Sequence, residues 1–123
     1  EEALKILSGE TLGYSNTFHK AIDLIIDTNF IPTLKKYNID RILTQGGIKN
    51  IDENIEKLII LNKQIKIIAG GGINEKNVNE IKKGVKNMHL GRLARKKGCY
   101  EQEIDLLYLK KTLLNWHSNQ IIL

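Results

Sequence analysis

Four short apolar runs rich in β-branched residues recur along this chain, and a longer stretch with helical periodicity follows each of them. The runs cover 14–19, 40–45, 65–69 and 86–90. Their centres lie 24, 25 and 21 residues apart, which is the length of a strand, a loop, a helix and a return loop. Because every return to the sheet passes through a helix, this alternation predicts a parallel α/β fold. The 123 residues allow a single domain.

The stretches between the runs carry signals for the ends of helices. Residues 2–8 look like the end of a first helix, and Pro32 stands in the first turn of the second, where its missing N–H costs nothing. Asn74 is a suitable N-cap for a short helix that Gly84 ends. A last helix is expected to bury one apolar face, formed by Ile104, Leu107, Tyr108 and Leu114.

Two architectures fit this pattern of parallel (β/α) units. Four strands form either a small open sheet with helices on both faces or half of an eight-stranded barrel, which typically needs about 250 residues. The chain opens at Glu1 and its only methionine is Met88, so we expect that it is not the intact product of a start codon. In both architectures ligands meet the carboxyl ends of the strands. The residues at those four ends are therefore the candidates for function.

The first strand end carries three polar groups within five residues, namely His19, Lys20 and Asp23. An imidazole exchanges a proton near neutral pH, and a nearby carboxylate can orient it. We take His19 and Asp23 as candidate catalytic residues and Lys20 as a point charge for an anionic ligand. A purely structural histidine is the alternative interpretation.

The second and fourth strand ends add further polar groups. Thr44 is followed by Gly46 and Gly47, and consecutive glycines let the backbone turn sharply and approach a ligand closely. A plain turn between strand and helix is the alternative. The fourth end supplies a second imidazole, His89, and a guanidinium, Arg92. His89 is a third catalytic candidate, and Arg92 is a candidate for binding an anion.

The third strand end is a run of three glycines, Gly70, Gly71 and Gly72, just before the helix expected from Asn74. Such a turn presents several backbone N–H groups and favours an anion. The spacing of these glycines differs from that of the dinucleotide-binding fingerprint. Because barrel enzymes often bind phosphate between the loops after their last two strands, we expect an anion site between these glycines and Arg92.

Composition narrows the classes of partner. An apolar fraction of 41% excludes a disordered polymer, and no apolar run reaches the length of a membrane span. The net charge of +5 would suit a nucleic acid, but 16 of the 19 basic residues are scattered lysines, so a nucleic-acid-binding module rests on charge alone. The lone Cys99 gives no metal-ligand spacing and fits a reducing, cytoplasmic compartment.

Four sequence blocks together resemble the CutC copper homeostasis family, over roughly residues 14–92. The blocks are Thr17–Asp23, Asp40–Gly47, Ile68–Ile73 and Met88–His89. The resemblance implies a TIM-type barrel of which residues 1–123 form one partial domain, the C-terminal half with about the last four strands. By position it carries over His19, Asp23, Thr44 and His89 as residues of the family's cleft. It also implies a role in copper homeostasis.

The chain departs from the family pattern at several positions. Lys20 stands where the family usually has Arg, so a bidentate fork is lost, and Gln45 replaces a Ser. Copper is implied by the resemblance alone, because the cysteines proposed to bind Cu(I) belong to the family's first four strands. Four strands also leave open edges, so we expect a homo-oligomer or a separate N-terminal half. The alternative function is a phosphate- or sugar-phosphate-binding barrel enzyme, an isomerase or aldolase that uses His19 or His89 as general acid or base.

Overall fold

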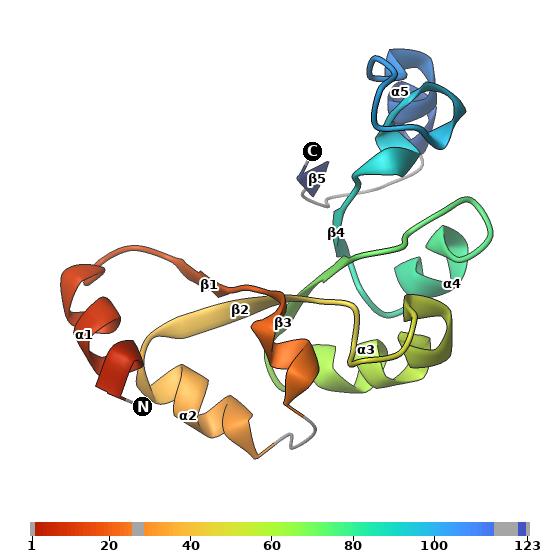
Figure 1. The fold of residues 1–123 in the computed structure, drawn as a ribbon. Helices are drawn as coiled ribbons and strands as arrows, with labels where there is room; N and C mark the ends of the chain where they lie inside the picture. The colour runs from red at the N-terminus through yellow and green to blue at the C-terminus, as the bar shows by residue number, and fades with distance from the viewer. Residues whose placement is uncertain (1, 26–28, 115–120, 123) are drawn as a thin grey trace.

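Five parallel strands form one sheet in the order β1-β2-β3-β4-β5, so each strand pairs with its neighbours in sequence. The computed structural model describes residues 2–25, 29–114 and 121–122 (Figure 1). The predicted parallel α/β alternation is confirmed. The strands are β1 (Asn16–Phe18), β2 (Ile39–Thr44), β3 (Lys66–Gly70), β4 (Asn87–His89) and β5 (Ile121–Ile122).

Helices connect the strands where the sequence predicts them. The α-helices are α1 (Glu2–Glu10), α2 (Phe30–Lys36), α3 (Ile55–Asn62), α4 (Val78–Lys82) and α5 (Leu106–Leu114). Short 3₁₀ turns follow the strands as η1 (Lys20–Leu24), η2 (Ile51–Asn54), η3 (Arg92–Ala94) and η4 (Lys96–Gly98). Asn77, rather than the predicted Asn74, is the N-cap of α4. Asn74 lies in the turn before the helix, where its Oδ1 accepts from the Lys76 N–H at 2.9 Å.

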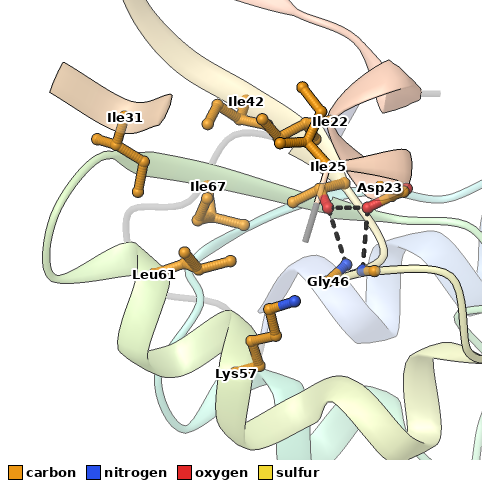
Figure 2. A pocket seen from close by; sticks show the side chains of 11 residues that line it. Ile22, Asp23, Ile25, Ile31, Ile42, Gly46, Lys57, Leu61 and Ile67 are labelled. Carbon is orange, nitrogen blue, oxygen red and sulfur yellow. Dashed lines mark hydrogen bonds between the residues drawn. The ribbon is translucent and has the colours of Figure 1, made fainter. Parts of the chain in front are cut away.

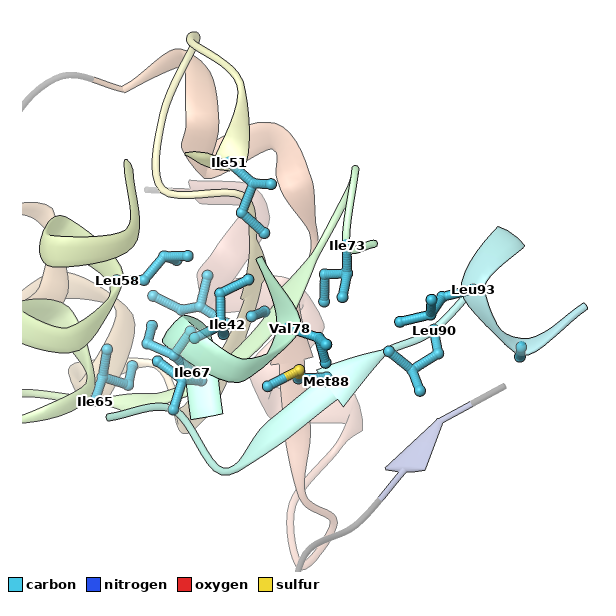
Figure 3. Packing of buried hydrophobic residues seen from close by; sticks show 14 of the residues in the cluster. Ile42, Ile51, Leu58, Ile65, Ile67, Ile73, Val78, Met88, Leu90 and Leu93 are labelled. Carbon is cyan, nitrogen blue, oxygen red and sulfur yellow. The ribbon is translucent and has the colours of Figure 1, made fainter. Parts of the chain in front are cut away.

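The main core lies between one face of the sheet and helices α2, α3 and α4 (Figure 3). Leu34, Leu58 and Ile81 contribute one fully buried side chain from each of these helices. From the sheet, Ile67 and Met88 join them, and both are 0% exposed. Burial of each such side chain stabilises the fold by about 1.5 to 3 kcal/mol relative to exposure. The helices are therefore fixed on the sheet, and the strand ends are held with them.

The other face of the sheet carries the alternate strand residues. Leu43 of β2 pairs with Ile68 of β3, and the two are 9% and 4% exposed. Neither belongs to the core that the helices cover. Because successive strand residues point to opposite faces, these two side chains form part of a second apolar layer.

The structure adds a strand that the sequence does not predict. β5 pairs in parallel with β4, with Met88 opposite Ile121 and His89 opposite Ile122. Two residues are too short a run for strand periodicity to detect. The expectation of four strands is therefore one strand short for the described part of the chain.

The predicted buried face of the last helix is only partly correct: Tyr108 is half-buried and packs against the core, but two other predicted residues do not. Leu107 is 83% exposed and Ile104 is 37% exposed, whereas Leu109 is 6% exposed. The prediction counted Ile104 as helical, but this residue pairs with Arg95 in an isolated antiparallel bridge, and α5 begins later. Tyr108 and Leu109 therefore form the side of α5 that packs against the core. The Leu114 side chain is not among those described.

Candidate functional site at the strand ends

Asp23 connects η1 with the turn that follows β2. Its carboxylate accepts hydrogen bonds from the Thr44 hydroxyl, from the Gln45 N–H at 3.2 Å and from the Gly47 N–H at 3.1 Å. Thr44 Oγ1 in turn accepts from the Gly46 N–H at 2.8 Å (Figure 2). Asp23 and Thr44 are 7% and 2% exposed. We expected Asp23 to orient His19 or Lys20, but these contacts instead make it the anchor of the turn after β2.

Glycine is required in that turn. Gly46 has a φ of +92°, and a β-carbon there would lie 2.7 Å from the Asn54 Cβ. The Asn54 amide donates to the Lys49 carbonyl at 2.9 Å and so closes the loop behind the glycines. The double glycine therefore serves a tight turn that packs on α3, as the alternative interpretation of the motif held.

A small cavity lies beneath this turn, between β2, η1, α2 and α3 (Figure 2). Its volume of about 30 Å³ is room for a water molecule or two. The lining is apolar except for Asp23, Thr44 and Lys57, whose side chain points toward the turn at Gly46. A cavity of this size excludes a substrate, and Asp23, which is 7% exposed, lines this cavity.

Lys20 joins the ends of three adjacent strands. It follows β1, and its Nζ donates to Gln45 Oε1, just after β2, at 2.7 Å. The Gln45 amide donates in turn to the carbonyls of Gly47 and Lys49, both at 3.1 Å. Lys20 Nζ also occupies the space where a side chain on Gly71 would start, and Gly71 has a φ of +99°. Gln45 thus fixes the ammonium over the glycines after β3.

His89 and His19 differ in their surroundings. A β-carbon on Gly70 would lie 3.2 Å from the His89 Cβ and 3.7 Å from its Nδ1, so the imidazole sits beside the end of β3. His89 is half-buried, whereas His19 is exposed. The structure therefore brings Lys20, Gly71 and His89 to one edge of the sheet, and it leaves His19 facing solvent.

Gly72 and Arg92 line a second space, a cleft of about 650 Å³ between the turn after β3 and the segment after β4. Two residues of the expected anion site, Gly72 and Arg92, thus line one cleft, whereas Gly70 and Gly71 are not among its lining residues. Tyr108 also lines it, and burial raises the pKa of its phenol, so the hydroxyl is a neutral donor at neutral pH. Lys76, Arg95 and Lys97 complete its basic lining.

Several of these residues are not among the site residues predicted from the sequence. Gln45 is one of them, and its side-chain oxygen accepts the hydrogen bond from Lys20. Arg95 and Lys97 follow the last strand motif by several residues, and no periodicity marks them. The Arg-Leu-Ala-Arg-Lys-Lys run from Arg92 was the one available signal, because charge of one sign gathers there.

Metal ligands are scarce in the described ranges. Within residues 2–25, 29–114 and 121–122, no three His, Cys, Asp or Glu side chains gather in a way that could hold a metal ion. Cys99 is a free thiol whose Sγ lies 2.5 Å from Glu101 Oε2, and this hydrogen bond lowers the pKa of Glu101. Each helix in the same ranges is too short or too polar to cross a bilayer.

Known proteins are similar to this chain over the range that contains these strand ends. The CutC family model matches residues 2–94. A CutC family protein of Vibrio cholerae is 39% identical over 87 residues, which are 65% of this chain and 34% of that protein. A CutC family protein of Enterococcus faecalis is 33% identical over 90 residues, covering 66% of this chain and 43% of its own length.

A third CutC family protein, from Bacteroides fragilis, is 34% identical over 96 residues, covering 70% of this chain and 37% of that protein. The matched part of the chain thus spans about a third to two fifths of the length of these relatives. The strand-end residues His19, Asp23, Thr44 and His89 lie within the matched range. The chain belongs to the CutC family.

Proposed function

We propose that this chain supplies the C-terminal half of a TIM-type (β/α)₈ barrel in a CutC protein with a role in copper homeostasis. The carrying observation is the sheet, in which consecutive parallel strands pair in sequence order and bring the family blocks to one edge. In a complete barrel such an edge holds the functional site. The longer relatives leave room for further (β/α) units.

A half-barrel needs a partner for its open sides. Within the described residues β1 pairs with β2 alone, so its other edge is open. Large apolar side chains are exposed on the first and last helices, with Ile6 at 62% and Leu107 at 83%. These helices stand at opposite ends of the sheet (Figure 1). We propose that either a second copy or a separate N-terminal half covers these surfaces.

Analytical ultracentrifugation of the isolated chain tests this part of the proposal. We expect association that grows with concentration and that Ile6→Lys or Leu107→Lys weakens. Ile60→Lys, at an exposed position on α3, is the matched control and should leave association unchanged. A monomer that unfolds cooperatively at every concentration would contradict the need for a partner.

Copper binding is proposed for the complete protein in the cytoplasm, with ligands that come from outside this chain. Cu(I) selects soft thiolate ligands, and this chain has one cysteine, Cys99. A competition titration against a chromophoric Cu(I) chelator tests the assignment. We expect the isolated chain to compete weakly and Cys99→Ser not at all, whereas a longer protein carrying the remaining strands should compete strongly. If that longer protein fails to retain copper, the copper role is wrong and the fold assignment stands.

A second candidate function is an enzyme that handles a phosphate or another small anion at the strand ends. The specific support is the convergence of the Lys20 ammonium, the Gly71 backbone and the His89 imidazole on one edge of the sheet. His89 would act as general acid or base, since His19 faces away into solvent. Thr44 and the glycines around it would shape the floor of the site rather than touch the ligand.

Thermal shift measurements test the second candidate. Inorganic phosphate or a sugar phosphate at millimolar concentration should raise the melting temperature of the chain. Lys20→Gln should remove most of this shift, while Lys63→Gln, which changes an exposed lysine after α3, should not. No shift with either ligand would contradict this function.

A further inference from the structure

We propose that the cleft between the turn after β3 and the segment after β4, which we call the basic cleft, binds a phosphate monoester of a small polyol. Four of its lining residues carry positive charge: Lys76, Arg92, Arg95 and Lys97. This inference takes its ligand class from the second candidate function, but it is an alternative to the strand-end site, because it places the phosphate in a different group of residues.

The basic residues of the cleft lack carboxylate partners. In the part of the chain that the structure describes, none of the four is in an ion pair, whereas the adjacent Lys96 is paired with Glu103 at 2.7 Å and lies outside the cleft. Two carboxylates, Glu75 and Asp105, also line the cleft. The Asp105 carboxylate already accepts the Tyr108 N–H at 2.9 Å. An excess of unpaired positive charge in a concave space favours an anion.

One wall of the basic cleft is braced by a buried asparagine. Asn77 is 3% exposed, and its amide donates to the Gly72 carbonyl at 3.0 Å and to Asp52 Oδ1 at 2.8 Å. Its Oδ1 accepts from the Asn74 N–H at 2.8 Å. The turn that carries Lys76 is therefore tied to η2 as well as to the end of β3. A wall fixed in this way loses little entropy when a ligand binds.

The opposite wall is braced by pairing across the segment 94–105. The Asp105 N–H donates to the Ala94 carbonyl at 2.9 Å, and the Lys96 N–H donates to the Glu103 carbonyl at 3.0 Å. Arg95 Nη1 donates to the Gln102 carbonyl at 2.9 Å, which fixes the guanidinium and leaves its other N–H groups available. Lys97, which lines the cleft, has a φ of +56°, an unusual conformation for a lysine.

The size and lining of the basic cleft define the class of ligand. About 650 Å³ is far larger than an inorganic phosphate and lies in the range of small-molecule sites. Arginine forks match the oxygens of a phosphate, and the neutral Tyr108 hydroxyl and the remaining carboxylate, Glu75, suit the hydroxyl groups of a polyol. The family match ends at residue 94, so Arg95 and Lys97 lie beyond the matched range.

Titration of the full chain with glycerol 3-phosphate, followed by calorimetry at low and moderate salt, tests the inference. We expect Arg95→Gln and Lys97→Gln each to weaken binding about tenfold or more, since each removes a charged hydrogen-bond donor. Lys96→Gln changes the neighbouring lysine outside the cleft and should leave the affinity unchanged. Free glycerol should not bind, because it lacks the phosphate.

Two outcomes overturn the inference. One is that the wild-type chain binds no glycerol 3-phosphate. The other is that Lys20→Gln abolishes binding while Arg95→Gln and Lys97→Gln do not, which places the phosphate at the strand ends and keeps the second candidate function. Conversely, loss of binding in the two cleft variants with full binding in Lys20→Gln supports the basic cleft and contradicts the strand-end site. If Arg95→Gln disturbs folding, Lys97→Gln still decides the result.

Discussion

Replacement of Asp23 by asparagine tests whether this residue is an anchor rather than a catalyst. The carboxylate accepts from one hydroxyl and two backbone N–H groups. In Asp23→Asn one oxygen becomes an NH₂ group, and if it is the oxygen that faces the Gln45 N–H, a donor then meets a donor. A lost hydrogen bond to a charged group costs about 1.5 to 3 kcal/mol, and the stranded buried donor adds about 1 to 3 kcal/mol. The remaining bonds also weaken without the charge. We therefore expect a loss of roughly 3 kcal/mol in the free energy of unfolding.

Urea denaturation followed by circular dichroism at a fixed chain concentration measures this loss. Glu53→Gln is the matched control, because it makes the same acid-to-amide change at an exposed ion pair with Lys49. That pair is exposed on both sides, so the control should shift the free energy by less than about 0.5 kcal/mol. If Asp23→Asn unfolds at the same urea concentration as the control, the anchoring role is refuted.

Three further predictions concern stability. Gly71→Ala should destabilise the chain by about 1 to 3 kcal/mol in thermal unfolding, because the positive φ of Gly71 and the Lys20 ammonium beside it disfavour a β-carbon. The control Gly9→Ala lies in open space on α1 and should instead stabilise the chain by up to about 1 kcal/mol. Leu58→Ala should cost about 2 to 5 kcal/mol in urea unfolding, since the side chain is fully buried, and a smaller loss would mean that α3 repacks. Burial raises the pKa of Tyr108, so the contribution of this residue to the free energy of unfolding is complete below pH about 10 and is lost as the pH rises through the higher folded pKa. Tyr108→Phe should therefore lose less stability than the wild type between pH 9 and pH 11. An equal loss of stability in both proteins over this range would contradict the prediction.

The middle of the sheet was predictable because it is buried on both faces. β3 after Lys66 and the last three residues of β2 are buried without a break, and short apolar runs of this kind that end in glycine-rich turns indicate parallel strands without any tertiary information. The phase of α5 was not predictable in this way. Ile104 pairs with Arg95 in an antiparallel bridge just before α5 begins, so it is not part of the helix. Hydrophobic periodicity along the sequence cannot detect such a contact between residues nine apart.

The candidate site was predictable as a location and less so as a set of contacts. Ligands meet the carboxyl ends of parallel strands, and this rule selects Lys20, Gly71 and His89 as site residues from the sequence. The structure brings these three residues to one edge of the sheet. The role of Asp23 could not be predicted, because the residue type alone does not tell a catalytic carboxylate from one that accepts backbone N–H groups. Of the basic cleft, the sequence predicts Arg92 as an anion-binding residue. The positions of Arg95 and Lys97 in the cleft could not be predicted, because they follow from how the segment after β4 folds back.

The agreement between strand order and sequence order bears on how the chain acquires its structure. No strand has to be inserted between two strands that are already paired, so every unit can be added to a free edge left by the unit before it. Each pairing closes a loop of about one (β/α) unit, which limits the entropy lost per step. During synthesis, β2 can therefore pair with β1 before β4 has left the ribosome. Assembly by addition at an edge also means that a gene fragment cut between two units keeps the pairings of every unit that it retains.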